Sequence, residues 1–326
     1  MSGAVTSVPG MRAAYASATK PDEPLAALTV GDQPEPAPPA GWVTVDVRAS
    51  TLNHHELWSL RGVGLPADRL PMILGCDASG VDPDGNEVVL HSVVEDPSDP
   101  RGFSLLSERH PGTLAERVAV PAANLVPKPA GISFLDAACL PTAWLTAWHM
   151  LTTRGRVADA DAVLVQGAGG GVASAAVILA AALGKRVYAT SRDATKRDRI
   201  ATLGATALEP GARLPERVGV VIESVGAPTF EHSLKCSAPG ARIVVCGATG
   251  GPFPKIDLRR VFMMQLEILG STMGTAAELA SLMDFLVEQN VRPVIDSTYG
   301  FTAVGEAFAR LNSGEVFGKV AIDHLH

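Results

Sequence analysis

The sequence predicts an α/β protein built around a doubly wound parallel sheet, and three observations support this prediction. From residue 162 onward, short β-branched runs alternate with helical segments. These runs are apolar throughout, which is typical of parallel strands that are covered on both faces. A glycine-rich turn joins the first run to an apolar helix in "VLVQGAGGGVASAAVILAAALG", which begins at Val163.

The chain before residue 162 has a different pattern. "GDQPEPAPPAGW" is a proline-rich turn between two strand-like runs, the second of which, "WVTVDVRAS", alternates with period two. We expect residues 1–10 to be a flexible lead-in and "EDPSDPRG" to be a surface loop. In "VPKPAGISFLDAACL" two prolines interrupt regular structure, and Ser133 is expected to cap a helix whose N3 residue is Asp136.

The parallel strands are expected in order along the second half of the chain. They are "AVLVQ", "KRVYAT", "VGVVIES", "ARIVVCG" and "LEILGSTMG". Helices are expected at about 193–203 and near 229–236. The last stretch, "RPVIDSTYGFTAVGEAFARLNSGEVFGKVAI", predicts strand, helix and strand, and we expect it to fold back onto the first domain.

Composition excludes several classes of protein. The chain has 326 residues, which is enough for two domains. A net charge of −7 without a basic run argues against nucleic-acid binding. The longest apolar run, 172–183, is too short to span a bilayer, and no secretion signal is evident. Four scattered cysteines without a CxxC pair favour a reduced, cytoplasmic location.

The glycine-rich turn predicts a dinucleotide site, because it lies between a strand and a helix. Small residues let the backbone approach a pyrophosphate, and the helix N-terminus offers free N–H groups. The literal GxGxxG pattern is absent, and a tight turn alone could use glycine for other reasons. The predicted phosphate-binding residues are Gly167, Ala168, Gly169, Gly170, Gly171 and Val172.

The end of the next strand predicts which nicotinamide cofactor is bound. NAD-binding versions of this arrangement carry a carboxylate there for the ribose 2′-hydroxyl. This chain instead has Ser191 and Arg192, followed by Lys196. A carboxylate would repel a 2′-phosphate, whereas these cations would pair with it. We therefore predict NADP(H), the alternative being that Arg192 and Lys196 only form a solvated helix start.

Several motifs together resemble the medium-chain dehydrogenase/reductase superfamily, and in particular its zinc-independent quinone oxidoreductase and enoyl reductase branch. They are "LNHHELW", "LPMILGCDASG", "LTAWHML", "VQGAGGGVASAAVILAAALG", "VIESVG", "PGARIVVCGATGG" and "FGKVAI", and they cover nearly the whole chain. The resemblance implies a GroES-like β-barrel catalytic domain made from both chain ends, at 1–127 and 274–326. It also implies a Rossmann domain at 128–273.

The same resemblance implies functional residues. The catalytic candidates in "LNHHELW" are Asn53, His55, Glu56 and Trp58. Thr142 and Thr146 are expected on the nicotinamide side. Gly247, Ala248 and Thr249 are expected along the other flank of the cofactor, and Lys319 near its phosphates. Relatives often carry Tyr at the position of Trp58, so the proton donor stays open between His55, Glu56 and solvent.

A catalytic zinc is not expected. Zinc-dependent relatives use Cys, His and Cys, with the His inside GHExxG, but that motif here reads "GCDASG" from Gly75. Asn53 and Thr142 stand at the other two ligand positions. A zinc site needs about three converging protein ligands, and His54, His55 and His149 are the remaining candidates for an unusual one.

The leading hypothesis is therefore an NADPH-dependent oxidoreductase that transfers hydride to a quinone or an α,β-unsaturated carbonyl. One alternative is an NADPH-binding protein with little turnover, used as a sensor or a structural subunit. Another is a zinc-dependent alcohol dehydrogenase with atypical ligands. We also expect a homodimer, because the apolar segment "FMMQLEILGSTM" is a candidate edge strand. The substrate is expected to be a small molecule.

Overall fold

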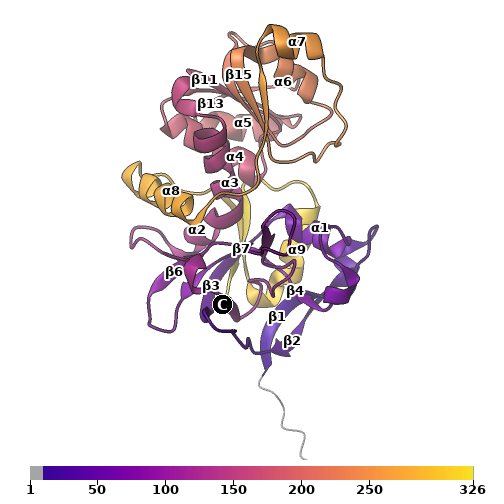
Figure 1. Cartoon of the computed structure of the whole chain (residues 1–326), viewed down its shortest axis with the longest axis vertical. Helices are drawn as coiled ribbons and strands as arrows, with labels where there is room; N and C mark the ends of the chain where they lie inside the picture. Colours follow the sequence, from indigo (N-terminus) through magenta and orange to yellow (C-terminus); the bar gives the residue numbers. More distant parts are fainter. Residues whose placement is uncertain (1–9, 326) are drawn as a thin grey trace, which may run out of the picture. The chain divides into compact units, whose positions relative to one another are not determined.

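The computed structural model of the protein describes residues 10–325, and it divides into two compact units. The first unit contains the chain up to Thr142, together with Ile295–Glu315 and the residues from Val320 onward. The second contains Ala143–Val294 and Val316–Lys319. Figure 1 labels many of the helices and strands of both units. Of the predicted lead-in, residues 1–9 lie outside the described residues, and Gly10 begins the first strand.

The second unit is built on a six-stranded sheet in the order β13-β12-β11-β14-β15-β16. All its neighbouring strands are parallel, which confirms the predicted doubly wound architecture. The strands are β11 (Ala162–Val165), β12 (Arg186–Thr190), β13 (Ala205–Leu208), β14 (Val218–Glu223), β15 (Ser237–Val245) and β16 (Glu267–Gly270). The strand order reverses on either side of β11, and ligands of open α/β sheets bind at such a switch point.

Helices cover this sheet because their apolar residues pack against the buried strands. Helix α4 (Gly171–Ala182) packs on β11 and β12, α5 (Ala194–Thr202) on β13, and α6 (Phe230–Cys236) on β14 and β15. Phe230 and Leu234 of α6 join one buried cluster with Leu164, Val221 and Ile243. The predicted helices near 193–203 and 229–236 are therefore confirmed.

One predicted strand is shorter than expected. The segment "FMMQLEILGSTM" begins at Phe262, but its first residues belong to α7 (Leu258–Met263). Only Glu267–Gly270 forms the edge strand β16. The apolar run therefore contains the end of a helix and a short strand. A turn at Gln265, where φ is 53°, separates the two. Apolar character alone did not distinguish the two.

The first unit is an antiparallel β domain made from both ends of the chain. Its central strand β3 (Trp42–Leu52) pairs with β5 (Asp77–Val81), β9 (Arg117–Pro121) and the C-terminal β18 (Lys319–Asp323). Figure 1 shows that yellow strand among the indigo and purple ones. The rest of this sheet is β6 (Glu87–Leu90), β10 (Leu125–Pro127) and β17 (Ile295–Gly300).

Smaller elements complete the first unit. A second sheet consists of β1 (Gly10–Ala16), β2 (Leu28–Pro34) and β4 (Met72–Ile73), and a hairpin consists of β7 (Val93–Glu95) and β8 (Phe103–Leu105). The helices are α1 (His54–Leu60), α2 (Phe134–Ala138) and α9 (Val304–Asn312). The succession β17, α9, β18 confirms the predicted strand, helix and strand.

The two compact units of the structure divide at Thr142/Ala143 and Val294/Ile295, while the domain boundaries at 127/128 and 273/274 stay a prediction. Helix α2 packs on β3 and β5 of the first unit, so residues 128–142 belong to that unit. Its cap agrees with the prediction, because the Ser133 Oγ accepts the Asp136 N–H at 3.1 Å. Helix α8 (Ala276–Glu288) packs on α3 (Leu145–His149), which keeps 274–294 in the second unit.

Within residues 10–325, no helix has both the length and the apolar character that a membrane span requires.

Candidate functional site

The turn after β11 forms a cradle of backbone. Gly167 has φ of 65° and Gly169 has φ of 144°, conformations that residues with a side chain rarely adopt. A Cβ at Gly170 would meet nothing within 4 Å, so this side of the turn is open. The first N–H groups of α4 have no acceptor within the helix and can receive an anion there. The predicted residues 167–172 therefore fit a pyrophosphate.

A distant segment of the chain closes the other side of this turn. The Gly318 N–H donates to the Gly169 carbonyl at 2.9 Å. Lys319 is only 2% exposed, and a Cβ on Gly171 would lie 2.9 Å from its Cδ. The Lys196 Nζ donates to the Val316 carbonyl at 3.0 Å. Both predicted lysines thus lie beside the glycine turn, and their role toward a phosphate stays a prediction.

The end of β12 is attached to the same turn. The Thr190 carbonyl accepts the Ala168 N–H at 2.7 Å, and the Thr190 hydroxyl accepts the Gly167 N–H at 3.2 Å and donates to Gln166 at 2.6 Å. These bonds place Ser191, which is 6% exposed, and the exposed Arg192 at the carboxyl end of β12. This is where NAD-binding versions carry their carboxylate.

The next carboxylate along the chain, that of Asp193, bonds to its own helix. Asp193 caps α5 and accepts the Lys196 N–H at 2.9 Å. Arg197, which the sequence did not single out, donates to the carbonyls of Ser191 and Arg192 at 2.9 and 3.0 Å. It therefore fixes the backbone of the turn that presents Arg192. In "RDATKRDR" nothing local distinguishes this arginine from its neighbours.

Glu223 at the end of β14 is a second residue that sequence reasoning missed. It is fully buried and accepts the N–H groups of Val225 and Gly226 at 2.8 and 3.0 Å. The hydroxyls of Thr229 and Ser233 donate to it at 2.9 and 2.8 Å. This carboxylate therefore shapes the loop between β14 and α6. Its only signal in the sequence is its place at the end of the apolar run "VGVVIES".

The predicted residues after β15 lie beside that loop. The Thr249 N–H donates to the Ser224 carbonyl at 3.2 Å. A Cβ added to Gly247 would lie 3.2 Å from the same carbonyl, and one added to Gly226 would lie 3.2 Å from Ala248. The turn after β11, the end of β12, the Glu223 loop and residues 247–249 thus share the carboxyl edge of the sheet. That edge is where a dinucleotide binds in this architecture.

The two predicted threonines lie on consecutive short helices. Thr142 belongs to the π-helical turn Leu140–Trp144, and its hydroxyl makes no hydrogen bond to another described residue. Thr146 belongs to α3, and its hydroxyl contacts the Met273 sulfur at 3.7 Å. Their expected position on the nicotinamide side stays a prediction.

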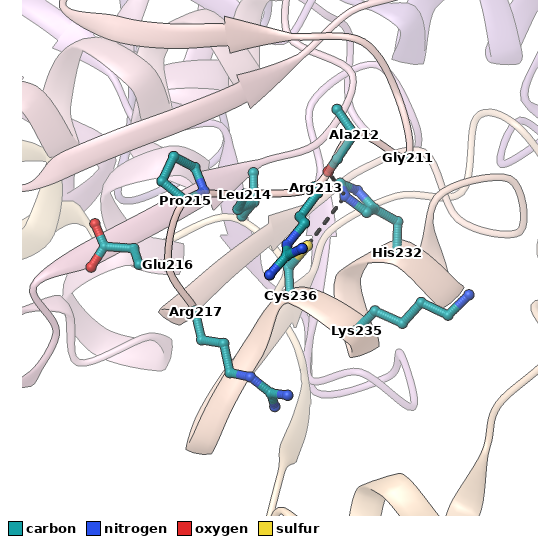
Figure 2. Close-up of a pocket in the computed structure, with 10 residues that line it drawn as sticks. All are labelled: Gly211, Ala212, Arg213, Leu214, Pro215, Glu216, Arg217, His232, Lys235 and Cys236. Carbon is teal, nitrogen blue, oxygen red and sulfur yellow. Dashed lines mark hydrogen bonds between the residues drawn. The ribbon is translucent and has the colours of Figure 1, made fainter.

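A pocket of about 410 Å³ lies between the loop 211–217 and α6 (Figure 2). The Gln166 amide donates to the His232 Nδ1 at 3.0 Å, and the His232 Nε2 donates to the Ala212 carbonyl at 2.8 Å. These bonds connect the pocket to Gln166, which directly precedes the glycine turn. None of the predicted site residues lines the pocket. Its lining residues are Gly211, Ala212, Arg213, Leu214, Pro215, Glu216, Arg217, His232, Lys235 and Cys236.

In the first unit, the catalytic candidates lie on α1 or cap it. Glu56 is fully buried, and its carboxylate accepts the N–H groups of Asn53 at 2.6 Å and Cys76 at 3.2 Å. It therefore anchors the helix start in a capping box, which favours the structural role over proton donation. Asn53 donates to Asp77 at 2.9 Å. Trp58 is 40% exposed, and its role in catalysis stays a prediction.

His55 lies between a thiol and a carboxylate. Its Nδ1 is 3.4 Å from the Cys76 Sγ, and its Nε2 is 3.3 Å from a Glu108 oxygen. Burial lowers the pKa of His55, but Cys76, Glu108 and Glu56 outweigh burial and raise it well above the usual value. Burial raises the pKa of the Cys76 thiol to about 11, although His55 opposes that shift. Glu108 was not among the predicted residues, since it lies in a loop far along the chain.

His55, Glu56 and Cys76 offer donor atoms that all lie within 4.8 Å of one another, so they are the set to test for zinc. Their hydrogen bonds do not fit that metal. Both Glu56 oxygens already accept backbone N–H groups. The Cys76 thiol donates to the Leu106 carbonyl at 3.2 Å, and a zinc-bound thiolate could not donate there. The arrangement fits a protonated thiol beside an imidazole.

Comparison with known proteins agrees with this geometry. Residues 171–288 match the family model described as zinc-binding dehydrogenase. A solved structure of an NAD-dependent alcohol dehydrogenase has 33% sequence identity and a TM-score of 0.85, covering 96% of this chain and 99% of that chain. The chain belongs to the medium-chain dehydrogenase/reductase superfamily. It is an NAD(P)-dependent oxidoreductase of that superfamily, as the carboxyl edge of the sheet indicates.

Two curated relatives carry different names. The zinc-type alcohol dehydrogenase-like protein YogA of Leptosphaeria maculans is 26% identical over 89% of this chain and 92% of its own length. An acryloyl-coenzyme A reductase of Sulfurisphaera tokodaii is 25% identical over 89% of this chain and 94% of its own length. The names of these two relatives point to two different chemistries, an alcohol dehydrogenation and an enoyl thioester reduction.

Replacing Glu223 with Ala is expected to reduce the free energy of unfolding by about 2–4 kcal/mol, because it leaves buried donors without an acceptor. Urea unfolding measures this change. The control is Glu231→Ala on α6, since Glu231 is exposed and forms a surface ion pair with Lys235, and we expect it to leave the midpoint unchanged. Equal effects of the two variants would contradict the role given to Glu223.

Elemental analysis of the purified protein tests the thiol and imidazole assignment. We expect no stoichiometric zinc, and we expect dialysis against zinc followed by desalting to leave the protein metal-free. One zinc per chain in the wild type that is lost in Cys76→Ser would show instead that Cys76 is a metal ligand.

Proposed function

We propose that this protein is an NADPH-dependent reductase that delivers hydride, without zinc, to a carbon–carbon double bond conjugated with a carbonyl. Enones, enoyl thioesters and quinones share this chemistry. The observation that carries the proposal is the carboxyl end of β12, where Ser191 and Arg192 stand in place of a carboxylate.

The charges at this edge support NADPH rather than NADH. The exposed Arg192 can form charge-assisted hydrogen bonds with a 2′-phosphate, and the Ser191 hydroxyl offers a further donor. Asp193 is engaged as a helix cap and Lys196 lies beside the turn. When bound, the cofactor supplies the hydride. The chain supplies the cradle of 167–172, which orients it.

Among the described residues, no set of donor atoms fits zinc. This supports an acceptor that is already activated for hydride transfer by its own conjugation. Without a Lewis acid, an isolated ketone or alcohol is difficult to polarise, whereas a conjugated double bond accepts hydride directly and forms an enolate. One relative is named acryloyl-coenzyme A reductase, and that name describes a reduction of this class. The other named relatives, which are zinc-type or NAD-dependent alcohol dehydrogenases, point to the competing activity.

Anaerobic NADPH oxidation with a panel of acceptors tests the proposal. The panel contains an enoyl thioester, a simple enone, a benzoquinone, a saturated ketone and a primary alcohol with NADP⁺. We expect turnover with one or more of the first three and analysis of the product to show a reduced double bond. Turnover confined to the ketone or the alcohol would overturn it, and so would NADPH binding without any turnover.

Arg192→Ala is expected to raise the Kd for NADPH about tenfold to a hundredfold, which is the loss of one or two charge-assisted hydrogen bonds. The Kd for NADH should not change. The matched control is Lys185→Ala, which lies just before β12 at the opposite edge of the sheet, and it should alter neither constant. Fluorescence titration with both cofactors measures the change. Equal losses for NADPH and NADH would refute the 2′-phosphate role.

We also propose that the protein is a homodimer that joins through the β16 edge. Four apolar side chains close to that edge in sequence are largely exposed, namely Phe253 (89%), Leu258 (69%), Phe262 (65%) and Met263 (73%). Exposed apolar groups of this size mark contact surfaces, and an unpaired strand edge is satisfied by a second copy.

Sedimentation tests the dimer. The double variant Phe262→Asp, Met263→Asp is expected to sediment as a monomer, because charge would be buried at the contact. Val287→Asp on α8 is the control, since that side chain is also exposed, and it should stay dimeric. A monomeric wild type would refute the dimer.

A further inference from the structure

We propose that Gln166 is a positioning residue for the cofactor. Its side-chain amide closes a ring of contacts that fixes Gly167, the first residue of the turn suited to a pyrophosphate. The proposal rests on the proposed function, because a nicotinamide dinucleotide must bind at this turn. Every residue of the ring belongs to the second unit.

Gln166 is a buried polar residue directly before the glycine turn, with no exposed surface. Its backbone N–H donates to the Ile222 carbonyl at 3.0 Å, which continues the pairing of β11 with β14 beyond the end of β11. Its side chain bonds to Thr190 of β12 and to His232 and Ser233 of α6. A buried amide is costly unless its polar atoms are paired, and here both its oxygen and its nitrogen have partners.

The amide oxygen holds the turn through Thr190. The Thr190 hydroxyl accepts the Gly167 N–H at 3.2 Å. The same hydroxyl donates its own hydrogen to the Gln166 Oε1 at 2.6 Å. Because that hydrogen is used toward Gln166, the lone pairs of the hydroxyl remain for Gly167.

The amide nitrogen holds the turn from the other side, through α6 and the loop after β14. The Gln166 Nε2 donates to the Ser233 hydroxyl at 3.0 Å, and that hydroxyl donates to the Glu223 carboxylate at 2.8 Å. The same carboxylate accepts the Val225 N–H at 2.8 Å. A Cβ on Gly167 would collide with the Val225 side chain, so Val225 lies against the backbone of Gly167 and the ring is closed.

The partners of Ser233 determine how the amide is oriented. The Ser233 hydroxyl donates to the Glu223 carboxylate and to the Thr229 carbonyl, which are groups that only accept. It can therefore only accept from Gln166, whose second N–H faces the His232 Nδ1 at 3.0 Å. The site needs an acceptor on one side and two donors on the other. A primary amide supplies both, whereas a carboxylate or an apolar side chain does not.

The position of Gly167 determines the position of the cradle. Gly167 has φ of 65°, and the next N–H, that of Ala168, donates to the Thr190 carbonyl at 2.7 Å. Thr190 therefore fixes two successive residues of the turn. Hydrogen bonds from a backbone cradle weaken steeply as distance and angle change, so groups that support the backbone contribute to affinity without touching the ligand. Gln166 acts in this way, through Gly167.

Cofactor titration of Gln166→Met tests the proposal, because methionine has a similar length but no amide. We expect the Kd values for NADPH and for NADH both to rise about tenfold, since the two cofactors share the pyrophosphate. Hydrogen exchange of the Gly167 N–H in protein without cofactor should become faster. Unchanged Kd values in folded Gln166→Met would overturn the positioning role.

Two variants of Thr190 keep the test decisive even if Gln166→Met does not fold. Thr190→Val removes the hydroxyl at nearly constant shape, and it should raise both Kd values as Gln166→Met does. Thr190→Ser keeps the hydroxyl and should keep most of the wild-type affinity. The double variant should bind no more weakly than the weaker-binding single variant, because both changes open the same ring. Equal Kd values for Thr190→Val and Thr190→Ser would contradict the ring.

Tyr188→Phe separates positioning from a general loss of stability. It also removes a hydroxyl from β12, but the partner of that hydroxyl is Glu216 at 2.8 Å, outside the ring. We expect a lower midpoint of urea unfolding and unchanged Kd values for both cofactors. If Tyr188→Phe weakened binding as much as Gln166→Met, reduced stability alone would explain the loss and the positioning role would fall.

Titration with NADH distinguishes this failure from failure of the proposed function. If the wild type prefers NADH or reduces no acceptor, the proposed function fails, but Gln166→Met can still be tested with NADH. If the wild type binds neither cofactor, both fail. If it binds them and the variants of Gln166 and Thr190 keep wild-type Kd values, only the positioning role fails.

Discussion

The cofactor edge of this protein depends on how the backbone of one turn is held. The Gly169 carbonyl accepts the Gly318 N–H, and the Thr190 carbonyl accepts the Ala168 N–H, so a distant segment and the neighbouring strand both fix the turn. Its remaining side at Gly170 stays open. The first N–H groups of α4 have no acceptor within the helix, and an anion is a suitable partner for them.

The residues around that turn hold the neighbouring loops in place. Glu223, which binds the N–H groups and hydroxyls of the next loop, shapes the same edge without offering a charge to the ligand. Arg197 binds carbonyls and leaves Arg192 exposed. One buried carboxylate and one arginine are thus used for structure, and the cation that stays exposed is the one suited to a phosphate.

In the first unit, the polar groups of Cys76 and Glu56 are engaged by the backbone. A zinc enzyme of this superfamily draws its electrophile from a metal, but here Cys76 donates to a carbonyl and Glu56 holds a helix start. In the same region, His55 lies between the Cys76 thiol and the Glu108 carboxylate. The loop that carries Glu108 is cross-linked by ion pairs, so this carboxylate is held beside His55.

Local pattern predicted most of the fold and the segments that share the carboxyl edge of the sheet. The apolar runs, the glycine turn and the Ser133 cap are each encoded within a few residues, so the sheet and its binding edge could be predicted. The partnership of His55 with Glu108 could not, because 53 positions separate them and only the tertiary fold brings them together. The contact of α2 with β3 is a second example, since it depends on packing between segments that are far apart in the sequence.

Calorimetric titration with 2′,5′-ADP and with 5′-AMP tests the central claim most directly, because the two ligands differ only in the phosphate that Ser191 and Arg192 would bind. We expect 2′,5′-ADP to bind at least tenfold more tightly than 5′-AMP. Equal affinity, or tighter binding of 5′-AMP, would contradict it.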